Sequence, residues 1–429
     1  MNIARRVTCG AVALALLAPA VAAAQQGSPF AQLFGRRPES TGRGYTAIQF
    51  RSATGGEWAQ TLEDTSLGGF ALPSGFGTSV DAAVDLDHVG GRLTSSVSAR
   101  GNYQRFNEGV AFAGVGGQVD AQAQVQATNR INLDFSARAA RSPFYMLVPE
   151  ASPELGRIIA PRGSLAARRA ENDMFEAMAG VTHQYSKRSS ISGWYSWREA
   201  RFSTVAGADF SARGARAEWR RRMSRDFTAR VGYGREQMTL SDQADPFIHE
   251  LIDIGVDFLR SISVARRTAL SIVTQTSVMK EAGRRRYRLN GAVDLQHRTG
   301  RTWRTSIGAQ RQTEFLPGFV EPLFSDTAHI GIGGFLSKRA SLNLAAYGGQ
   351  SQIGFSGRDF LTYAGNARLG VALTRHFGLY TQYVYYHYQL PPDAQNAVLL
   401  QRLSRQGVSI GVQTWLPILN KENAPRDSR

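Results

Sequence analysis

Apolar and polar residues alternate along most of the chain beyond residue 44. The stretch GQVDAQAQVQATNRINLDFSAR, residues 117–138, gives the clearest case. Its apolar positions are Val119, Ala121, Ala123 and Val125, followed by Ile131, Leu133, Phe135 and Ala137. Successive side chains of a strand point to opposite faces, so this pattern predicts two strands, each with one apolar and one polar face. We expect Thr128–Arg130 to be the short turn between them.

The same alternation recurs in many later and earlier segments. It includes residues 80–87, 93–100, 175–181, 227–233, 252–258, 287–296, 366–374 and 408–416. The predicted strands are about 9–13 residues long, which exceeds the usual length in soluble domains and suits a tilted membrane crossing. A soluble two-sheet sandwich would favour heavier and more continuous aliphatic runs. Here the apolar side is rich in alanine and the other side is polar, which favours a transmembrane barrel.

Short and long connections alternate between the predicted strands. The short turns fall near 88–92, 128–130, 186–189, 224–226, 264–267, 298–301, 337–340 and 374–377. The long connections fall near 104–116, 147–171, 202–208, 240–247, 280–286, 314–325, 352–359 and 390–402. This asymmetry is typical of outer-membrane barrels, which have short periplasmic turns and long external loops.

The fold class that we predict is all-β, a transmembrane antiparallel up-and-down β-barrel of about 18 strands. The count includes Tyr45–Ser52 as the first strand, with 53–77 as the first outer loop; it falls to 16 if this hairpin is instead a loop. An even number of strands puts both termini in the periplasm of a Gram-negative cell. We therefore expect a periplasmic segment at 25–43, a barrel at 44–417 and a periplasmic tail at 418–429.

Residues 1–24 have the pattern of a cleaved signal peptide. Arg5 and Arg6 precede the apolar run AVALALLAPAVAAA, and small residues end it before Gln25. The run is shorter than the roughly 20 residues that a membrane-spanning helix needs. The single cysteine, Cys9, lies before this run, so the mature chain has no cysteine for disulfides, thiol chemistry or metal binding.

The chain is strongly basic, with a formal net charge of +16 that becomes +14 once Arg5 and Arg6 are removed. An exported protein of this charge suits an anionic surface or polymer, whereas nucleic acid is not an expected partner.

Aromatic residues gather in a few predicted strands. One group is Trp194, Tyr195 and Trp197, another is Tyr383, Tyr385, Tyr386 and Tyr388, and Trp219, Trp303 and Trp415 lie towards strand ends. We expect them to form belts at the two lipid–water boundaries, in preference to cross-strand pairs in a soluble sheet.

The polar face of a barrel this wide lines an aqueous lumen, so any site should lie there. The candidate basic residues of the solute path are Arg100, Arg138, Arg198, Arg216, Arg220, Arg230, Arg288, Arg304 and Arg368. The acidic residues on the same face are Asp81, Asp85, Asp120, Asp134, Glu176, Glu218, Asp253, Asp257 and Asp294. One interpretation is a ladder of ion pairs that stiffens the interior. The other is a basic track for anions, because the guanidinium fork suits carboxylate and phosphate.

Three arginine clusters and one loop lie at or near the ends of predicted strands. Arg220–Arg222 and Arg266–Arg267 fall at periplasmic turns and Arg284–Arg286 at an outer loop, where they are either solvated flanking charge or, for the outer cluster, contacts to lipopolysaccharide phosphates. The long loop at 147–171 either folds inward as a constriction or projects outward.

No catalytic or metal-binding pattern is present. None of the seven histidines has the H-E-x-x-H spacing, and no G-x-S-x-G occurs. The glycine-rich pieces at 114–118 and 331–335 are not followed by a predicted helix, so they lack the geometry of a phosphate loop. We therefore predict a protein that is not an enzyme and that binds no cofactor or metal.

The last strand, RQGVSIGVQTWLPILN from Arg405 to Asn420, resembles the closing strand of outer-membrane barrels that are associated with bacterial exopolysaccharide secretion systems. The resemblance extends over the barrel in length, signal and strand rhythm. It implies export of a polysaccharide, as by the arginine-lined alginate exporter, and a periplasmic polysaccharide-export protein as partner. The chain departs from most barrels in continuing through Lys421–Arg429 in place of a terminal aromatic residue.

The leading hypothesis is an outer-membrane channel that exports an anionic exopolysaccharide past the lumen arginines. The alternatives are a general diffusion porin or small-solute channel, and a non-conducting surface or scaffold barrel. In every case the expected surroundings are outer-membrane lipid and lipopolysaccharide.

Overall fold

The chain forms one closed β-barrel. A computed structural model describes residues 44–64, 74–107, 112–143, 171–203, 209–240, 246–261, 267–281, 284–300, 302–314, 322–354, 358–390 and 402–422. Within these ranges there are 18 strands and no helix that is long and apolar enough to cross a membrane. The predicted signal peptide, the segment 25–43 and nearly all of the loop 147–171 lie outside the described residues.

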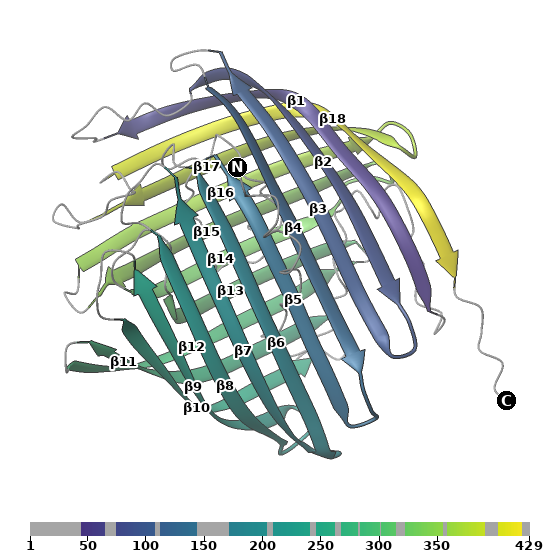
Figure 1. The fold of residues 1–429 in the computed structure, drawn as a ribbon. Coiled ribbons are helices and arrows are strands. Elements are labelled where there is room, and N and C mark those ends of the chain that lie inside the picture. The colour runs from purple at the N-terminus through teal and green to yellow at the C-terminus, as the bar shows by residue number, and fades with distance from the viewer. Residues whose placement is uncertain are drawn as a thin grey trace, which may run out of the picture.

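The strands follow one another around the wall in chain order. They are β1 (Tyr45–Asp64), β2 (Gly75–Val89), β3 (Leu93–Phe106), β4 (Phe112–Gln126), β5 (Ile131–Ser142), β6 (Asn172–Ser186), β7 (Ser189–Phe202), β8 (Phe210–Arg222), β9 (Phe227–Leu240), β10 (Phe247–Ser261), β11 (Thr268–Glu281), β12 (Arg284–Thr299), β13 (Trp303–Glu314), β14 (Leu323–Phe335), β15 (Ala340–Ile353), β16 (Arg358–Ala372), β17 (Phe377–Gln389) and β18 (Arg402–Glu422). Each strand pairs antiparallel with its neighbours in sequence, and β1 pairs with β18 to close the ring (Figure 1). The predicted 18-stranded up-and-down barrel is confirmed.

The two faces of the wall have the expected character. Apolar side chains of one parity point outward and are largely exposed, among them Val84 on β2, Val119 on β4 and Ile307 on β13. Residues of the other parity point inward and are polar or small, such as Ser98, Gln118 and Asp253. The apolar face of residues 117–138 therefore lies on the outside of the barrel, and the glutamines of this segment and Asp120 lie on the inside.

Four of the short turns use the same local device. In each, a Ser or Thr hydroxyl accepts hydrogen bonds from backbone N–H groups two and three residues later. The hydroxyls belong to Thr128, Ser224, Ser337 and Thr374, at donor–acceptor distances of 3.0–3.2 Å. Such turns need few residues, which explains why these connections are short.

The first strand is longer than predicted. The sequence analysis ended it at Ser52 with a loop over 53–77, but β1 runs to Asp64. Its second half contains Gly55, Gly56 and many polar residues, so the apolar alternation is weak there. The half is nevertheless held by backbone pairing with β18 as far as Asp64 and with β2 as far as Ala59.

The last strand is also longer than predicted. We placed the end of the barrel at 417, whereas β18 continues to Glu422, opposite Tyr45. Pro417 lies inside this strand although proline cannot donate a ladder hydrogen bond. However, the pairing of β17 with β18 ends at Thr414, and the register of β1 against β18 shifts at Ile48–Gln49, where Gln49 faces Pro417. Proline is therefore accommodated on a locally one-sided edge.

The aromatic groups do not all lie at the lipid boundary. Tyr195 and Tyr383 are exposed on the outer face as expected. Tyr386 and Tyr388 are buried, and Trp194 lies under the guanidinium group of Arg216, 5.7 Å from the ring centroid, on the inner face. The belt prediction is wrong for these, because adjacent aromatic residues on a strand must point to opposite faces.

Candidate functional site

All nine arginines predicted for the solute path have the inward parity of their strands, but Arg288 contacts Asp326, which has outward parity on β14, so Arg288 does not line the lumen. Each is one residue away, along its strand, from positions that point outward, such as Ala99 beside Arg100 and Val231 beside Arg230. The structure does not bring them together as one track, because they belong to β3, β5, β7, β8, β9, β12, β13 and β16. Their surroundings differ strongly from one part of the wall to another.

Three of the nine belong to a buried cluster of charges on β8, β9 and β10. We call Arg216, Arg220, Arg230, Glu218, Asp253 and Asp257 the inner ion-pair network. Glu218 and Asp253 have no exposed side-chain surface, and only 4% of the Arg230 side chain is exposed. The network has three positive and three negative groups, so its formal charge is balanced.

Arg230 is the central cation of this network. Its Nε lies 2.9 Å from a carboxylate oxygen of Asp253, and its Nη1 lies 3.0 Å from Asp257. Arg216 contacts both Glu218 and Asp253, and Arg220 contacts Glu218. Pairing of this density offsets the cost of removing the charges from water.

Arg230 also forms a hydrogen bond at an irregularity in the pairing of β10 with β11. Between β10 and β11 the register shifts between Ile252 and Asp257, which leaves local backbone groups without ladder partners. The Nη2 of Arg230 donates a hydrogen bond to the carbonyl oxygen of Thr274 at 2.6 Å, and the Thr274 hydroxyl accepts one from the Val256 N–H at 3.0 Å. Side chains thus satisfy backbone groups that the bulge would leave unpaired.

Three other predicted arginines, Arg198, Arg138 and Arg100, lie beside acidic or hydroxyl groups. Arg198 is 2.7 Å from Glu236, which in turn is 3.6 Å from the His249 ring, and Arg138 is 3.6 Å from Asp120. The Nε of Arg100 donates to the Ser98 hydroxyl at 3.3 Å.

Arg368 contacts an amide and an aromatic ring. It donates to the side-chain carbonyl of Gln413 at 3.1 Å and lies over the ring of Tyr380 at 4.9 Å. Arg304 occupies an inward position next to the short turn that precedes β13.

Several inward charges were not assigned a role from the sequence. Arg51 on β1 forms a two-pronged ion pair with Asp85, with both hydrogen bonds at 2.6 Å. Arg405 on β18 is fully buried and donates to the Thr61 hydroxyl at 3.2 Å. The prediction that β1 ended at Ser52 hid this last contact, because Thr61 was taken as part of a loop.

Charge is distributed unevenly around the inner surface. Inward positions of β2–β6, which we call the acidic wall, hold the carboxylates of Asp81, Asp85, Asp87, Asp120, Asp134 and Glu176 and the guanidinium groups of Arg100 and Arg138. Inward positions of β13–β18, the arginine wall, hold Arg304, Arg368 and Arg405. The inward positions from Arg304 to Gln312 on β13, those of β14–β17, and those from Leu403 to Trp415 on β18 hold no acidic residue. In the ring of strands, β13–β15 lie across the barrel from β4–β6, whereas β18 is separated from β2 only by β1 (Figure 1).

The described residues contain no group of three or more His, Cys, Asp or Glu side chains that could hold a metal ion. The inward side chains described above interact through charged, amide and hydroxyl groups.

Comparison with known proteins finds resemblance at the level of solved structures. No protein-family model matches the sequence, and no curated protein matches it. Solved structures with similar folds are outer-membrane barrels that include OpdL and OccK7 (OpdD) of Pseudomonas aeruginosa and OccAB4 of Acinetobacter baumannii.

The alignments to these structures cover most of both chains, but the sequence identities and TM-scores are low. OpdL aligns with a TM-score of 0.43 at 12% identity over 87% of this chain and 99% of its own. OccK7 aligns with a TM-score of 0.44 at 9% identity over 88% and 99%, and OccAB4 with 0.41 at 10% over 86% and 98%.

Proposed function

We propose that this protein is an outer-membrane channel for small polar solutes, in which opposite charges on facing walls orient the solute during passage. The observation that carries the proposal is the separation of the acidic wall from the arginine wall. An 18-stranded barrel encloses an aqueous passage, and a field across such a passage favours solutes with a dipole or with charges of both signs.

The orientation in the membrane follows from the connections. Tyr45 at the start of β1 pairs with Val89 and Glu422, so the first and last described strand ends lie with the short turns. Short turns face the periplasm in outer-membrane barrels, which supports a periplasmic location for both termini.

Export of an anionic polysaccharide is less well supported than passage of small solutes. A track for a polyanion needs consecutive cations whose charge is not already neutralised. Arg216, Arg220 and Arg230 instead lie within the balanced inner ion-pair network. No described contact calls for a periplasmic export partner.

The test is liposome swelling together with planar-bilayer recording on the purified full-length barrel. We expect zwitterionic amino acids to enter faster than neutral sugars of similar size. The informative variant combines Asp81→Asn on the acidic wall with Arg368→Gln on the arginine wall, because it weakens the transverse field and leaves the net charge unchanged. We expect it to remove the advantage of zwitterions while neutral sugars enter at the original rate.

Three results would contradict the proposal. An absence of conductance would favour a non-conducting barrel. Exclusion of small neutral sugars together with block by acidic oligosaccharides would favour polysaccharide export. An unchanged zwitterion preference in the double variant would show that the two walls do not act on the solute.

A further inference from the structure

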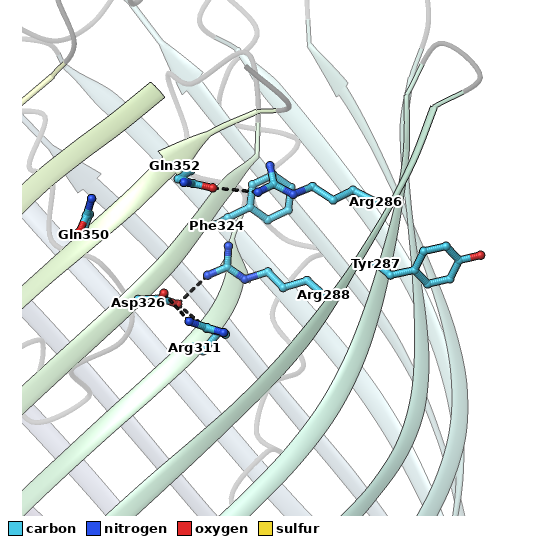
Figure 2. A pocket seen from close by; sticks show the side chains of 8 residues that line it. All are labelled: Arg286, Tyr287, Arg288, Arg311, Phe324, Asp326, Gln350 and Gln352. Atoms are coloured by element: carbon cyan, nitrogen blue, oxygen red, sulfur yellow. Dashed lines mark hydrogen bonds and ion pairs between the residues drawn. The ribbon is translucent and has the colours of Figure 1, made fainter. Parts of the chain in front are cut away.

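A second arginine cluster lies outside the lumen, at the end of the barrel that carries the long connections. We call the cavity lined by Arg286, Tyr287, Arg288, Arg311, Phe324, Asp326, Gln350 and Gln352 the outer arginine pocket; its volume is about 360 Å³. Its side chains come from β12, β13, β14 and β15 (Figure 2).

The pocket exists because two strands separate. β12 pairs with β13 only between Gly291 and Thr299, opposite Arg311 and Trp303. The part of β12 before Gly291 continues beside β11 without a ladder to β13. The first part of β12 and the neighbouring part of β13 are therefore no longer paired within one layer of the sheet.

Strand parity shows how the two sides overlap. Arg286 and Arg288 share the inward parity of β12 with the buried Asn290, whereas Asp326 shares the outward parity of β14 with the exposed Ile330. Yet Arg288 contacts Asp326, so the inner face of β12 lies against the outer face of β14 and β15. Figure 2 shows Arg286 and Arg288 extending towards Phe324 and Asp326, while Tyr287 points the opposite way.

The charges of the pocket are not balanced. Its one carboxylate, that of Asp326, is shared by Arg288 at 2.7 Å and by Arg311 at 2.7 and 2.8 Å. Arg286 donates to neutral acceptors, the Gln352 side-chain carbonyl at 2.8 Å and the Gly354 carbonyl at 3.1 Å. The lining therefore has three guanidinium groups against one carboxylate.

Some of the donor capacity of the pocket is unused within the described structure. The Nε–H of Arg288 is buried, and no hydrogen-bond acceptor for it occurs among the described atoms. The guanidinium group of Arg286 is held over the Phe324 ring at 4.3 Å, with that of Arg288 at 5.3 Å. Two arginine forks fixed by an aromatic ring are preorganised for an anion with several oxygens.

The position of the pocket indicates where that anion comes from. Arg311 continues the outward stripe of Ile307 and Ala309 on β13, and Asp326 continues that of Ala328 and Ile330 on β14. The pocket thus begins where the lipid-facing surface ends. Tyr287, with 66% of its surface exposed, lies at the same level, as expected for an aromatic residue at a lipid–water boundary.

We propose that the outer arginine pocket binds a phosphate group of the anionic glycolipid that forms the outer leaflet. The excess of guanidinium groups supplies positive charge, and their fixed orientation supplies the geometry for a phosphate. The pocket lies at the edge of the lipid-facing surface, which is the level of a lipid headgroup. This site is independent of the proposed passage of solutes, since it lies on the other side of the wall.

The test measures lipid retained by the purified full-length barrel in detergent, using native mass spectrometry and titration with bisphosphorylated lipid A. We expect binding to lipid A and much weaker binding to the same lipid after its phosphates are removed. The double variant Arg286→Gln/Arg288→Gln should bind lipid A roughly tenfold more weakly, because each basic residue near an anionic surface adds about a severalfold factor.

Two further variants guard against misfolding. The single variant Arg311→Gln changes an exposed side chain and should also weaken binding. Arg141→Gln is the matched control, because Arg141 is exposed on the outward face of β5 and already pairs with Glu171 and Asp173. It should bind lipid A like the unchanged protein. Equal binding by all variants, or equal binding of phosphorylated and dephosphorylated lipid, would overturn the proposal. Displacement of lipid A by an equal concentration of inorganic phosphate would assign the site to a free anion and would overturn the lipid source.

Discussion

Two arginine clusters on the same barrel have opposite relations to their carboxylates. The inner ion-pair network matches three arginines with three acids, and its central groups are almost completely buried. The outer arginine pocket has three arginines and a single carboxylate, that of Asp326, and 56% of the Arg311 side chain is exposed. The number of nearby carboxylates, more than the number of arginines, separates a cluster that stabilises the wall from one that is poised to bind an anion.

The largest loss of stability is expected from removal of the central cation of the inner ion-pair network. Arg230→Met would leave Asp253 and Asp257 buried beside too few positive groups and the Thr274 carbonyl without its donor. We expect a loss of about 3–5 kcal/mol in the free energy of unfolding. Urea titration of the barrel in detergent, followed by heat-modifiable electrophoretic mobility, measures it. A loss below about 1 kcal/mol would mean that the network is not structural.

The bulge that Arg230 occupies offers a second test. An ideal Cβ at Gly255 would overlap the Thr274 carbonyl oxygen, so Gly255→Ala must displace β10 from β11. We expect a destabilisation of about 1–3 kcal/mol, as in other overpacked sites. Gly56→Ala on β1 is the matched control, because a Cβ there would meet no atom within 4 Å. Equal effects of the two changes on the urea midpoint would argue against a tightly packed bulge.

The outer pocket should respond in the opposite sense when its acid is removed. Asp326→Asn breaks one ion pair with the exposed Arg311 and one with the largely buried Arg288; because 47% of the Asp326 side chain is itself exposed, the cost should be about 1 kcal/mol of stability. It also raises the excess of positive charge, so phosphorylated lipid should bind severalfold more tightly. The lipid A titration described above measures the change. Weaker binding in this variant would show that Asp326 organises the arginines and that charge excess is not decisive.

The smallest effect is expected at an arginine that belongs to neither cluster. Arg141 is exposed and pairs with Glu171 and Asp173 at 3.2 and 4.0 Å. Replacing it by glutamine should change the free energy of unfolding by less than about 0.5 kcal/mol, because exposed ion pairs contribute little. A larger shift in the urea midpoint would show that parity and exposure do not identify structural arginines on this wall.

The architecture was predictable because alternation and turn spacing are local properties of the chain. Inside and outside followed from parity alone, and the nine arginines of the predicted path all have inward parity. The ends of β1 and β18 were not predictable, since their pairing with each other replaces the apolar signal that the residues around Gly55 and Pro417 lack.

The candidate sites were less predictable than the fold. The partner of a given arginine depends on the register between strands, and a sequence does not specify that Arg230 reaches the carboxylates of β10 and the backbone of β11. The overlap of β12 with β14 is even harder to predict from the sequence, because parity places Arg288 and Asp326 on opposite faces of the wall although they are in contact. The signal that the sequence did contain was a charged residue of outward parity, such as Arg311, just beyond an apolar stripe.

The pairing of β1 with β18 has a consequence for biogenesis. The seam that closes the wall joins Tyr45 to Glu422, so both edges remain open until the last strand is available. Contacts this distant in sequence are slow to form, and open edges pair readily with other chains. If the chain is inserted into the outer membrane as proposed, we therefore expect chaperones to prevent its aggregation before insertion. Loss of the residues after Thr414 should leave an aggregating, protease-sensitive chain, because seven of the 19 paired positions of the seam would be missing.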